Sequence, residues 1–433
     1  MNPLAEELNK TLQGTVAHDL LSEFGKRFYF PKGIVAQSAE AKKHAKRFNV
    51  TIGMAYHKDE PIELPTIKNA LPELSSSEAV SYAPTTGDTE LRNLWKELIV
   101  EKNPETERDA MSLPVVVSGL TNGIMQAADL FADPGDSIII PDMFWGNYRL
   151  IFEGRNKAHI RSFPFFTEEG SLNISGLEET IRTYAGNSNA DYGKSIVVLN
   201  FPNNPTGYSP TIQEADRIKD VLASCADDGI KLAVIIDDAY FGLFYDDHTY
   251  KHSIFSKLYD LHENLLAIKV DGATKEDFVW GFRLGFVTFA GKGLKPEHYE
   301  ALTTKLGGAI RSSISNSSRP AQSMLKHAIT NSGYRKEKQA YFSLLQSRYQ
   351  KVREIIDQRT TGLSLKPLPF NSGYFMSFYF EGGSAEELRK ELLFEEGIGT
   401  ISIQDTYLRI AYSSIDEENL EELYTTIFAA ADR

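Results

Sequence analysis

The chain has 433 residues, of which 42% are hydrophobic and 24% are charged, and its formal net charge is −13. These fractions are ordinary for a globular protein, and the length exceeds that of a usual single domain, so we expect two domains. The negative charge argues against a nucleic-acid partner, because binding to phosphate backbones relies on clustered Lys and Arg. No apolar run approaches 18 residues, so we expect no membrane partner either.

The cysteine content and the first residues predict the compartment. Cys225 is the only cysteine, which excludes an intrachain disulfide and a Cys-rich metal site, and we expect no bound metal. The first residues, MNPLAEELNKTLQG, are polar and carry acids, unlike a signal or transit peptide. We therefore expect a cytoplasmic protein.

The first hundred residues predict an arm, a short strand and a helix. Residues 1 to about 48 are polar and favour helix, with a break at residues 30–33 (FPKG). Residues 49–53 predict a short strand that ends in glycine. A loop rich in Pro and Gly at residues 81–87 (SYAPTTG) then precedes an amphipathic helix over residues 89–100.

From about residue 114, apolar strands alternate with helical segments. This pattern is typical of βαβ units, so it predicts a mainly parallel sheet covered on both faces. The expected strands are residues 114–118, 137–140, 195–199, 231–236 and 265–270.

The segments that follow the first three strands carry candidate binding groups. Ligands bind at the carboxyl edge of such sheets, where these segments meet. Residues 119–123 (GLTNG) begin a helix whose free backbone N–H groups suit an anion. Trp145 lies in a polar loop, where its ring could stack on an aromatic ligand. Residues 200–207 (NFPNNPTG) predict a rigid turn that presents amide groups, including Asn204.

The last two strands lead into ionisable residues. Asp237 ends an apolar strand, where a carboxylate is costly unless it meets a positive partner, and Tyr240 follows three residues later. Lys275 emerges after the strand at 265–270 and can form an imine with an aldehyde once its ammonium is partly desolvated. Arg283 stands on a GxRxG turn and suits a phosphate dianion.

Beyond residue 289 the alternation fades, and residues 334–357 predict one long helix. The chain after it has the mixed pattern of a smaller α+β domain. We expect an N-terminal arm with part of the small domain at residues 1–59, a large cofactor-binding domain at 60–330, and the rest of the small domain at 331–433.

Together, the five strand ends supply an anion cradle, a stacking ring, an amide turn, a buried carboxylate and an imine-forming lysine with an arginine. One ligand fits this set, pyridoxal 5′-phosphate. A carboxylate at Asp237 keeps the ring nitrogen protonated, which makes the ring an electron sink. Asn204 and Tyr240 are expected to bond the ring hydroxyl oxygen.

The sequence resembles the fold type I aminotransferases of class I/II, and among them the aspartate aminotransferase group, over essentially its whole length. The resemblance implies an α/β fold with a mainly parallel seven-stranded sheet in a large domain and a smaller α+β domain. The matching strings, in order, are Tyr82–Gly87 (YAPTTG), Ser118–Thr121 (SGLT), Trp145–Asn147 (WGN), Asn203–Gly207 (NNPTG), Asp237–Tyr240 (DDAY), Lys275 with Arg283, and Arg409.

The resemblance also implies the role of each matched residue. Lys275 would form the Schiff base and shuttle the proton. The phosphate would bind Ser118, Gly119, Leu120 and Thr121, with Arg283 as its charge partner, and Trp145 would stack on the ring. Arg409 would take the substrate carboxylate with help from the backbone at Gly53. Tyr82 would reach the phosphate of a neighbouring subunit, which implies a homodimer with shared active sites.

The chain departs from the family pattern at Gly272 and in the loop before Arg409, where residues 401–405 (ISIQD) replace a common Pro-Gly turn. Family members usually carry a serine three residues before the lysine, and this chain has Gly272 there. Phosphate binding must then depend on Ser118, Thr121, Arg283 and the helix end.

The resemblance implies a transaminase that moves an amino group between an amino acid and a 2-oxo acid such as 2-oxoglutarate by a ping-pong cycle. The alternative from the same fold is a lyase or decarboxylase, because the outcome depends on which bond at the α-carbon is aligned with the cofactor ring. A regulator with an aminotransferase-like sensor domain is a third class, but such chains carry a DNA-binding domain ahead of the fold.

Arg311 yields a prediction about the amino donor. It stands five residues before Asn316, the spacing at which dicarboxylate-specific relatives keep an arginine, so it would pair with the side chain of aspartate or glutamate across the dimer. A structural arginine is the alternative, and the donor would then be aromatic or neutral.

We expect Arg311→Leu to lower kcat/KM for aspartate and glutamate about tenfold or more relative to phenylalanine and alanine, since an unpaired buried charge costs on the order of 1–3 kcal/mol. An unchanged preference order would show that Arg311 does not contact the substrate.

Overall fold

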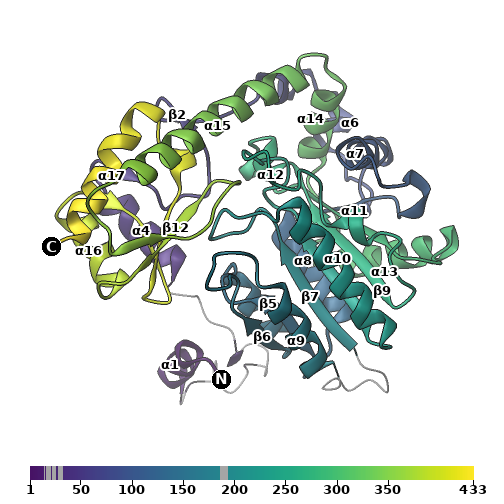
Figure 1. Ribbon diagram of the computed structural model, residues 1–433. Helices are drawn as coiled ribbons and strands as arrows, with labels where there is room; N and C mark the ends of the chain where they lie inside the picture. Colours follow the sequence, from purple (N-terminus) through teal and green to yellow (C-terminus); the bar gives the residue numbers. More distant parts are fainter. Residues whose placement is uncertain (14, 16–20, 22–25, 28–32, 186–193) are drawn as a thin grey trace.

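The computed structural model describes the whole chain except residues 14, 16–20, 22–25, 28–32 and 186–193. It contains a seven-stranded sheet and a four-stranded sheet that lie side by side, with the long helix α15 (Tyr334–Gln358) passing from one to the other (Figure 1). Most of the predicted break at residues 30–33 lies outside the described residues. Among the described residues, no helix combines the length and the apolar character needed to cross a bilayer.

The seven-stranded sheet has the order β4-β10-β9-β8-β7-β5-β6. Only β10 runs antiparallel to its neighbours β4 and β9, so the prediction of a mainly parallel sheet is confirmed. The strands are β4 (Val115–Val117), β5 (Ser137–Pro141), β6 (His159–Phe163), β7 (Lys194–Asn200), β8 (Lys231–Asp237), β9 (Leu265–Asp271) and β10 (Gly285–Ala290).

The strand residues alternate between two hydrophobic clusters because successive side chains of a strand point to opposite faces. In β7, Ile196 and Val198 belong to one cluster, whereas Val197 and Leu199 belong to the other. Both faces are therefore covered, which explains the continuous apolar runs in the sequence.

Helices cover each face of this sheet. One face carries α8 (Leu120–Phe131) and α13 (Pro296–Ser313), and the other carries α9 (Ile174–Tyr184) and α10 (Ile212–Asp227). The other helices of this part are α5 (Pro65–Lys68), α6 (Ser76–Val80), α7 (Thr89–Lys102), α11 (Phe255–Leu258), α12 (Ala273–Glu276) and α14 (Arg319–Thr330).

The smaller sheet has the order β11-β12-β15-β14 and is antiparallel. Two parallel residue pairs join the N-terminal segment to this part of the chain, because β1 (Phe48–Asn49) pairs with β13 (Ile398–Gly399). The predicted strand at residues 49–53 is therefore shorter and starts one residue earlier. The remaining elements are α1 (Pro3–Leu12), α4 (Ile34–His44), β2 (Tyr56–His57), β3 (Glu60–Pro61), β11 (Leu365–Pro367), β12 (Met376–Phe380), α16 (Ala385–Phe394), β14 (Ile401–Ile403), β15 (Tyr407–Ile410) and α17 (Glu417–Ala431).

The turn after β7 packs closely against the loop before β12. The Gly207 carbonyl accepts hydrogen bonds from the backbone N–H groups of Asn371 (3.0 Å) and Ser372 (2.9 Å). Gly207 has φ +74°, and a Cβ there would lie 1.9 Å from the Phe375 carbonyl oxygen. A side chain is thus excluded both by the backbone angle and by the neighbouring loop.

We expect Gly207→Ala to destabilise the chain much more than Gly229→Ala does. Gly229 has φ +87° but nothing within 4 Å of its added Cβ, so this control measures the cost of the left-handed backbone, about 1 kcal/mol. Gly207→Ala adds a clash with backbone, worth about 1–3 kcal/mol more. Equal losses of unfolding free energy in denaturant titrations of the two variants would contradict this account.

Candidate functional site

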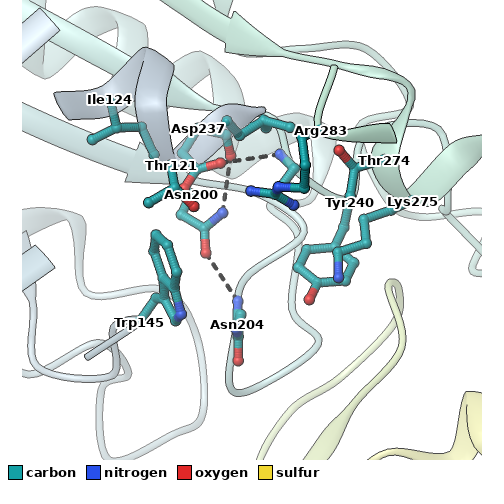
Figure 2. Close-up of a pocket in the computed structure, with 12 residues that line it drawn as sticks. Thr121, Ile124, Trp145, Asn200, Asn204, Asp237, Tyr240, Thr274, Lys275 and Arg283 are labelled. Carbon is teal, nitrogen blue, oxygen red and sulfur yellow. Dashed lines mark hydrogen bonds between the residues drawn. The ribbon is translucent and has the colours of Figure 1, made fainter. Parts of the chain in front are cut away.

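A cavity of about 190 Å³ lies at the carboxyl edge of the large sheet, where the segments after β4, β5, β7, β8 and β9 meet (Figure 2). Arg283 reaches the same edge because the antiparallel strand β10 begins there. The lining residues are Leu120, Thr121, Ile124, Trp145, Asn200, Asn204, Asp237, Ala239, Tyr240, Thr274, Lys275 and Arg283.

The start of α8 forms one wall of the cavity. Gly119 precedes the helix with φ +80°, and no side chain caps the free backbone N–H groups. A Cβ at Gly119 would lie 2.8 Å from Nη2 of Arg283, so the glycine lets the guanidinium approach the helix end. Cationic and N–H donors therefore converge where an anion would bind. Ser118 lies beside this wall and does not line the cavity.

Asp237 lies at the end of β8 and is almost fully buried. Its carboxylate accepts a hydrogen bond of 2.5 Å from the Tyr148 hydroxyl and one of 3.1 Å from the Ala239 N–H. Burial raises the pKa of Asp237 to about 6, although these two hydrogen bonds act in the opposite direction. The carboxylate is ionised at neutral pH and is placed to pair with a cation in the cavity.

Lys275 lies near the end of α12, just past β9, and its Nζ donates to the Gly53 carbonyl oxygen at 2.7 Å. Burial, together with the positive charges of Arg283 and Arg409, lowers the pKa of Lys275 to about 7, against the opposing effect of Asp237. A substantial share of this amine is therefore unprotonated near neutral pH, as a nucleophile requires.

Arg409 brings a cation from the smaller sheet to the cavity edge. Its guanidinium donates to the Asn204 side-chain oxygen and to the Thr51 carbonyl oxygen, each at 3.0 Å, and lies 4.3 Å from the centre of the Phe375 ring. Burial lowers the pKa of Arg409 to about 10, so it stays charged at neutral pH.

Two aromatic residues face each other across the cavity. Figure 2 shows Trp145 on the side opposite Tyr240 and Lys275. The Trp145 ring meets the ring of Tyr148 edge to face at 5.6 Å. Tyr240 is buried beside Lys275, whose Nζ lies 5.0 Å from the Tyr240 ring centre, and burial raises the pKa of its hydroxyl. A flat ring between these two walls would contact both.

Tyr82 and Arg311, two of the predicted site residues, are exposed in this single chain and do not line the cavity. Tyr82 is 91% exposed. Arg311 is also exposed, in the last turn of α13, and donates to the Ser315 hydroxyl at 2.6 Å. Their predicted roles in a neighbouring subunit stay predictions.

The structure gives a reason for Gly272, where the family has a serine. A Cβ at this position would lie 2.7 Å from the Leu284 carbonyl oxygen and 2.9 Å from the Gly285 Cα. The start of β10 thus occupies the space that a side chain would need.

Two residues of the site were missed by the sequence analysis. Tyr148 was passed over although it stands three residues after Trp145, and its hydroxyl contacts Asp237. Asn200 bridges two elements, because its amide donates to the Asp237 carbonyl oxygen and accepts from the Asn204 N–H, both at 2.9 Å (Figure 2). The sequence signal for Asn200 is its place as a polar residue at the end of an apolar strand.

The chain is similar to known aminotransferases. The model of the family "Aminotransferase class I and II" matches residues 46–427. The mitochondrial aspartate aminotransferase of Saccharomyces cerevisiae is 28% identical over 218 residues, 46% of each chain, and a probable N-acetyl-LL-diaminopimelate aminotransferase of Bacillus subtilis is 27% identical over 53% of this chain and 52% of its own. The chain thus spans about half the length of the curated relatives it matches.

Solved structures share the fold along nearly the whole chain. An aminotransferase from Anaerococcus prevotii superposes with a TM-score of 0.84 at 23% identity, over 96% of this chain and 100% of that one. The Thermus thermophilus aspartate aminotransferase with maleate gives a TM-score of 0.72 at 19% identity, over 95% and 99%. The expected fold class is confirmed.

We expect Tyr148→Phe to raise the pKa of Asp237. The change removes one hydrogen bond to the ionised carboxylate, worth about 1.5–3 kcal/mol, and 1.36 kcal/mol corresponds to one pKa unit. The pKa should therefore rise from about 6 by roughly one unit or more. As the pH falls, the carboxylate then becomes protonated at a higher pH than in the wild type. A carbon-13 titration of labelled aspartate in the full chain measures the shift.

The matched control is Tyr208→Phe, which removes a buried hydroxyl that donates to Glu214 at 2.6 Å, away from the cavity. This variant should leave the titration of Asp237 unchanged. If both variants shift it equally, the contact with Tyr148 is not the cause.

Proposed function

The chain belongs to the aminotransferase class I and II family, and we propose that it is an aminotransferase that moves an amino group between an amino acid and a 2-oxo acid such as 2-oxoglutarate. One observation carries the proposal. Lys275, whose pKa is lowered to about 7, and Asp237, a buried carboxylate, line the same cavity. An amine nucleophile paired with a fixed anion is what imine chemistry on a protonated ring requires.

Members of the family use pyridoxal 5′-phosphate, and the cavity residues fit this group. The uncapped start of α8 and Arg283 suit its phosphate, and the glycine at 119 leaves room that a Cβ would fill. When bound, the cofactor supplies an aldehyde for the amino group and a ring that withdraws electrons from the substrate α-carbon.

We propose the following roles for this chain's residues. The backbone at Gly119, Leu120 and Thr121, with Ser118, holds the phosphate together with Arg283. Asp237 holds a proton on the ring nitrogen, and Tyr148 fixes the carboxylate. Trp145 stacks on the ring, while Asn204 and Tyr240 bond the ring hydroxyl oxygen. Except for Gly119 and Ser118, which lie beside the cavity, these assignments are supported by the positions of the residues around it.

Lys275 is proposed to carry the proton between the substrate α-carbon and the cofactor. Its amine accepts the proton in its neutral form, which its lowered pKa provides at neutral pH. Arg409 would hold the substrate carboxylate, next to the Gly53 backbone that Lys275 contacts. The substrate α-carbon would thereby face the Lys275 amine.

The proposal extends to the assembly of the chain. We propose a homodimer in which Tyr82 reaches the partner's phosphate, supported by the almost complete exposure of Tyr82 in the single chain. Arg311 would contact a dicarboxylic substrate in the same dimer; an aromatic donor is the alternative. The division at residues 59/60 and 330/331 and the cytoplasmic location belong to the proposal too. No observation favours a lyase or a decarboxylase.

We expect the purified chain with pyridoxal 5′-phosphate to convert the cofactor to its pyridoxamine form when a suitable amino acid is added. The measurement is the change in visible absorbance for a panel of aspartate, glutamate, phenylalanine and alanine. Lys275→Ala should slow this half-reaction by at least about 10²-fold, because it removes both the nucleophile and the proton carrier. Lys305→Ala, at an exposed position of α13, is the control.

Reduction of the loaded protein with borohydride, followed by digestion, should leave the cofactor on the peptide that contains Lys275. A label on another lysine would contradict the assignment. Release of a decarboxylated or eliminated product without the pyridoxamine form would show a lyase.

A further inference from the structure

The helix that carries Lys275 is only one turn long. Because α12 spans Ala273–Glu276, it is far shorter than a helix that is stable alone, and its orientation depends on tertiary contacts. The residues that contact this turn from other elements therefore determine where the Lys275 amine lies.

A buried ion cluster holds the two residues that follow Lys275. Glu276 pairs with Lys102 of α7 at 2.5 Å and with Lys338 of α15 at 3.2 Å. Lys338 also pairs with Asp277 at 2.8 Å, and Asp277 accepts a 2.5 Å hydrogen bond from the Tyr334 hydroxyl. Lys338 thus joins both carboxylates to the helix that runs between the two sheets.

This cluster is mostly buried, although Lys102, Glu276 and Lys338 border a second cavity of about 400 Å³ and the Lys102 side chain is 24% exposed. The side chain of Asp277 is fully buried, and those of Glu276 and Lys338 are about 15% exposed. Gly242 packs against it so tightly that a Cβ would lie 2.5 Å from Oε1 of Glu276. Buried charges are costly unless each meets its partner in one geometry, so the cluster fixes a single arrangement of residues 276 and 277.

A second contact comes from the loop before β12. The Tyr374 hydroxyl donates to the Lys275 carbonyl oxygen at 2.8 Å, and the Lys275 amine lies 5.8 Å from the Tyr374 ring centre. Tyr374 is fully buried. The backbone of Lys275 is therefore tied to the smaller domain, while the next two residues are tied to α15.

We propose that Lys338 and Tyr374 are positioning residues that hold Lys275 in its place in the cavity, so that the packing of α15 and of the loop before β12 sets the reactivity of the lysine. This inference rests on the proposed function only for the part that concerns amino transfer. Neither residue lines the cavity, so each acts through the backbone of residues 275–277.

The position of Lys275 can be measured through its titration. The charged and titratable groups that face its amine are Arg283, Arg409, Asp237, Tyr240 and Tyr374. A lysine released from this place would be better solvated and further from the two arginines. Its pKa would then rise from about 7 towards its ordinary value.

The experiment compares Lys338→Met and Tyr374→Phe with the wild type. In the full chain without cofactor, the acylation rate of Lys275 is followed against pH by mass spectrometry of its peptide. We expect the midpoint to rise by about one unit in Lys338→Met, and in the same direction in Tyr374→Phe. In the loaded protein, kcat should fall about tenfold or more while KM stays within about twofold, since Arg409 is untouched.

Three controls separate positioning from charge and from stability. Lys351→Met removes an ion pair with Glu421 on an exposed part of the same helix and should change neither quantity. Lys338→Arg keeps the charge and should restore most of the wild-type midpoint. Tyr374→Phe removes no charged group, so a shift there cannot result from the loss of a neighbouring charge.

An unchanged acylation midpoint in a folded Lys338→Met or Tyr374→Phe protein would overturn the inference, even if the melting temperature falls. Should Lys338→Met fail to fold, Tyr374→Phe decides alone. The acylation readout needs no turnover. A wild-type protein that transfers no amino group would therefore refute the proposed function and leave the positioning test intact.

Discussion

The burial of Asp237 and Lys275 in one cavity is the constraint on which the site depends. The same desolvation moves the two pKa values towards each other, to about 6 for the acid and about 7 for the amine. An anion and a partly neutral amine then coexist at neutral pH. Because Arg283 lines the cavity and Arg409 lies at its edge, the charges around the cavity suit a ligand with both phosphate and carboxylate groups.

That burial is possible only because two parts of the chain close over the same sheet edge. Arg409 arrives from β15 and Gly53 from the N-terminal segment, and both contact groups at the carboxyl ends of the large sheet. The Gly207 turn fixes this joint by accepting two backbone hydrogen bonds from the loop before β12. The contact between the two sheets therefore also sets the geometry of the cavity. A change at this contact would alter the positions of the residues around the cavity.

Much of the fold could be predicted because local patterns determine it. The five apolar runs after residue 114 became β4, β5, β7, β8 and β9, and the long helix appeared at Tyr334–Gln358. Two strands gave weaker signals. The edge strand β6 (HIRSF) is polar and partly exposed. Strand β10 follows directly on the Arg283 turn, so no separate loop marks where it begins.

The sequence motifs predicted several residues that line the cavity, but not the residues that hold Lys275 in position. Lys275, Asp237 and Asn204 stand in strings whose spacing identifies them, and strand ends bring them to one edge. Lys338 and Tyr374 stand in no such string, and each is more than 60 residues from Lys275 along the chain. Tyr374 bonds the Lys275 carbonyl oxygen and Lys338 pairs with the next two residues only through the packing of separate elements. A short sequence pattern can predict which residues line the cavity. The orientation of Lys275 depends on long-range contacts, and for a one-turn helix these contacts are nearly all that hold it.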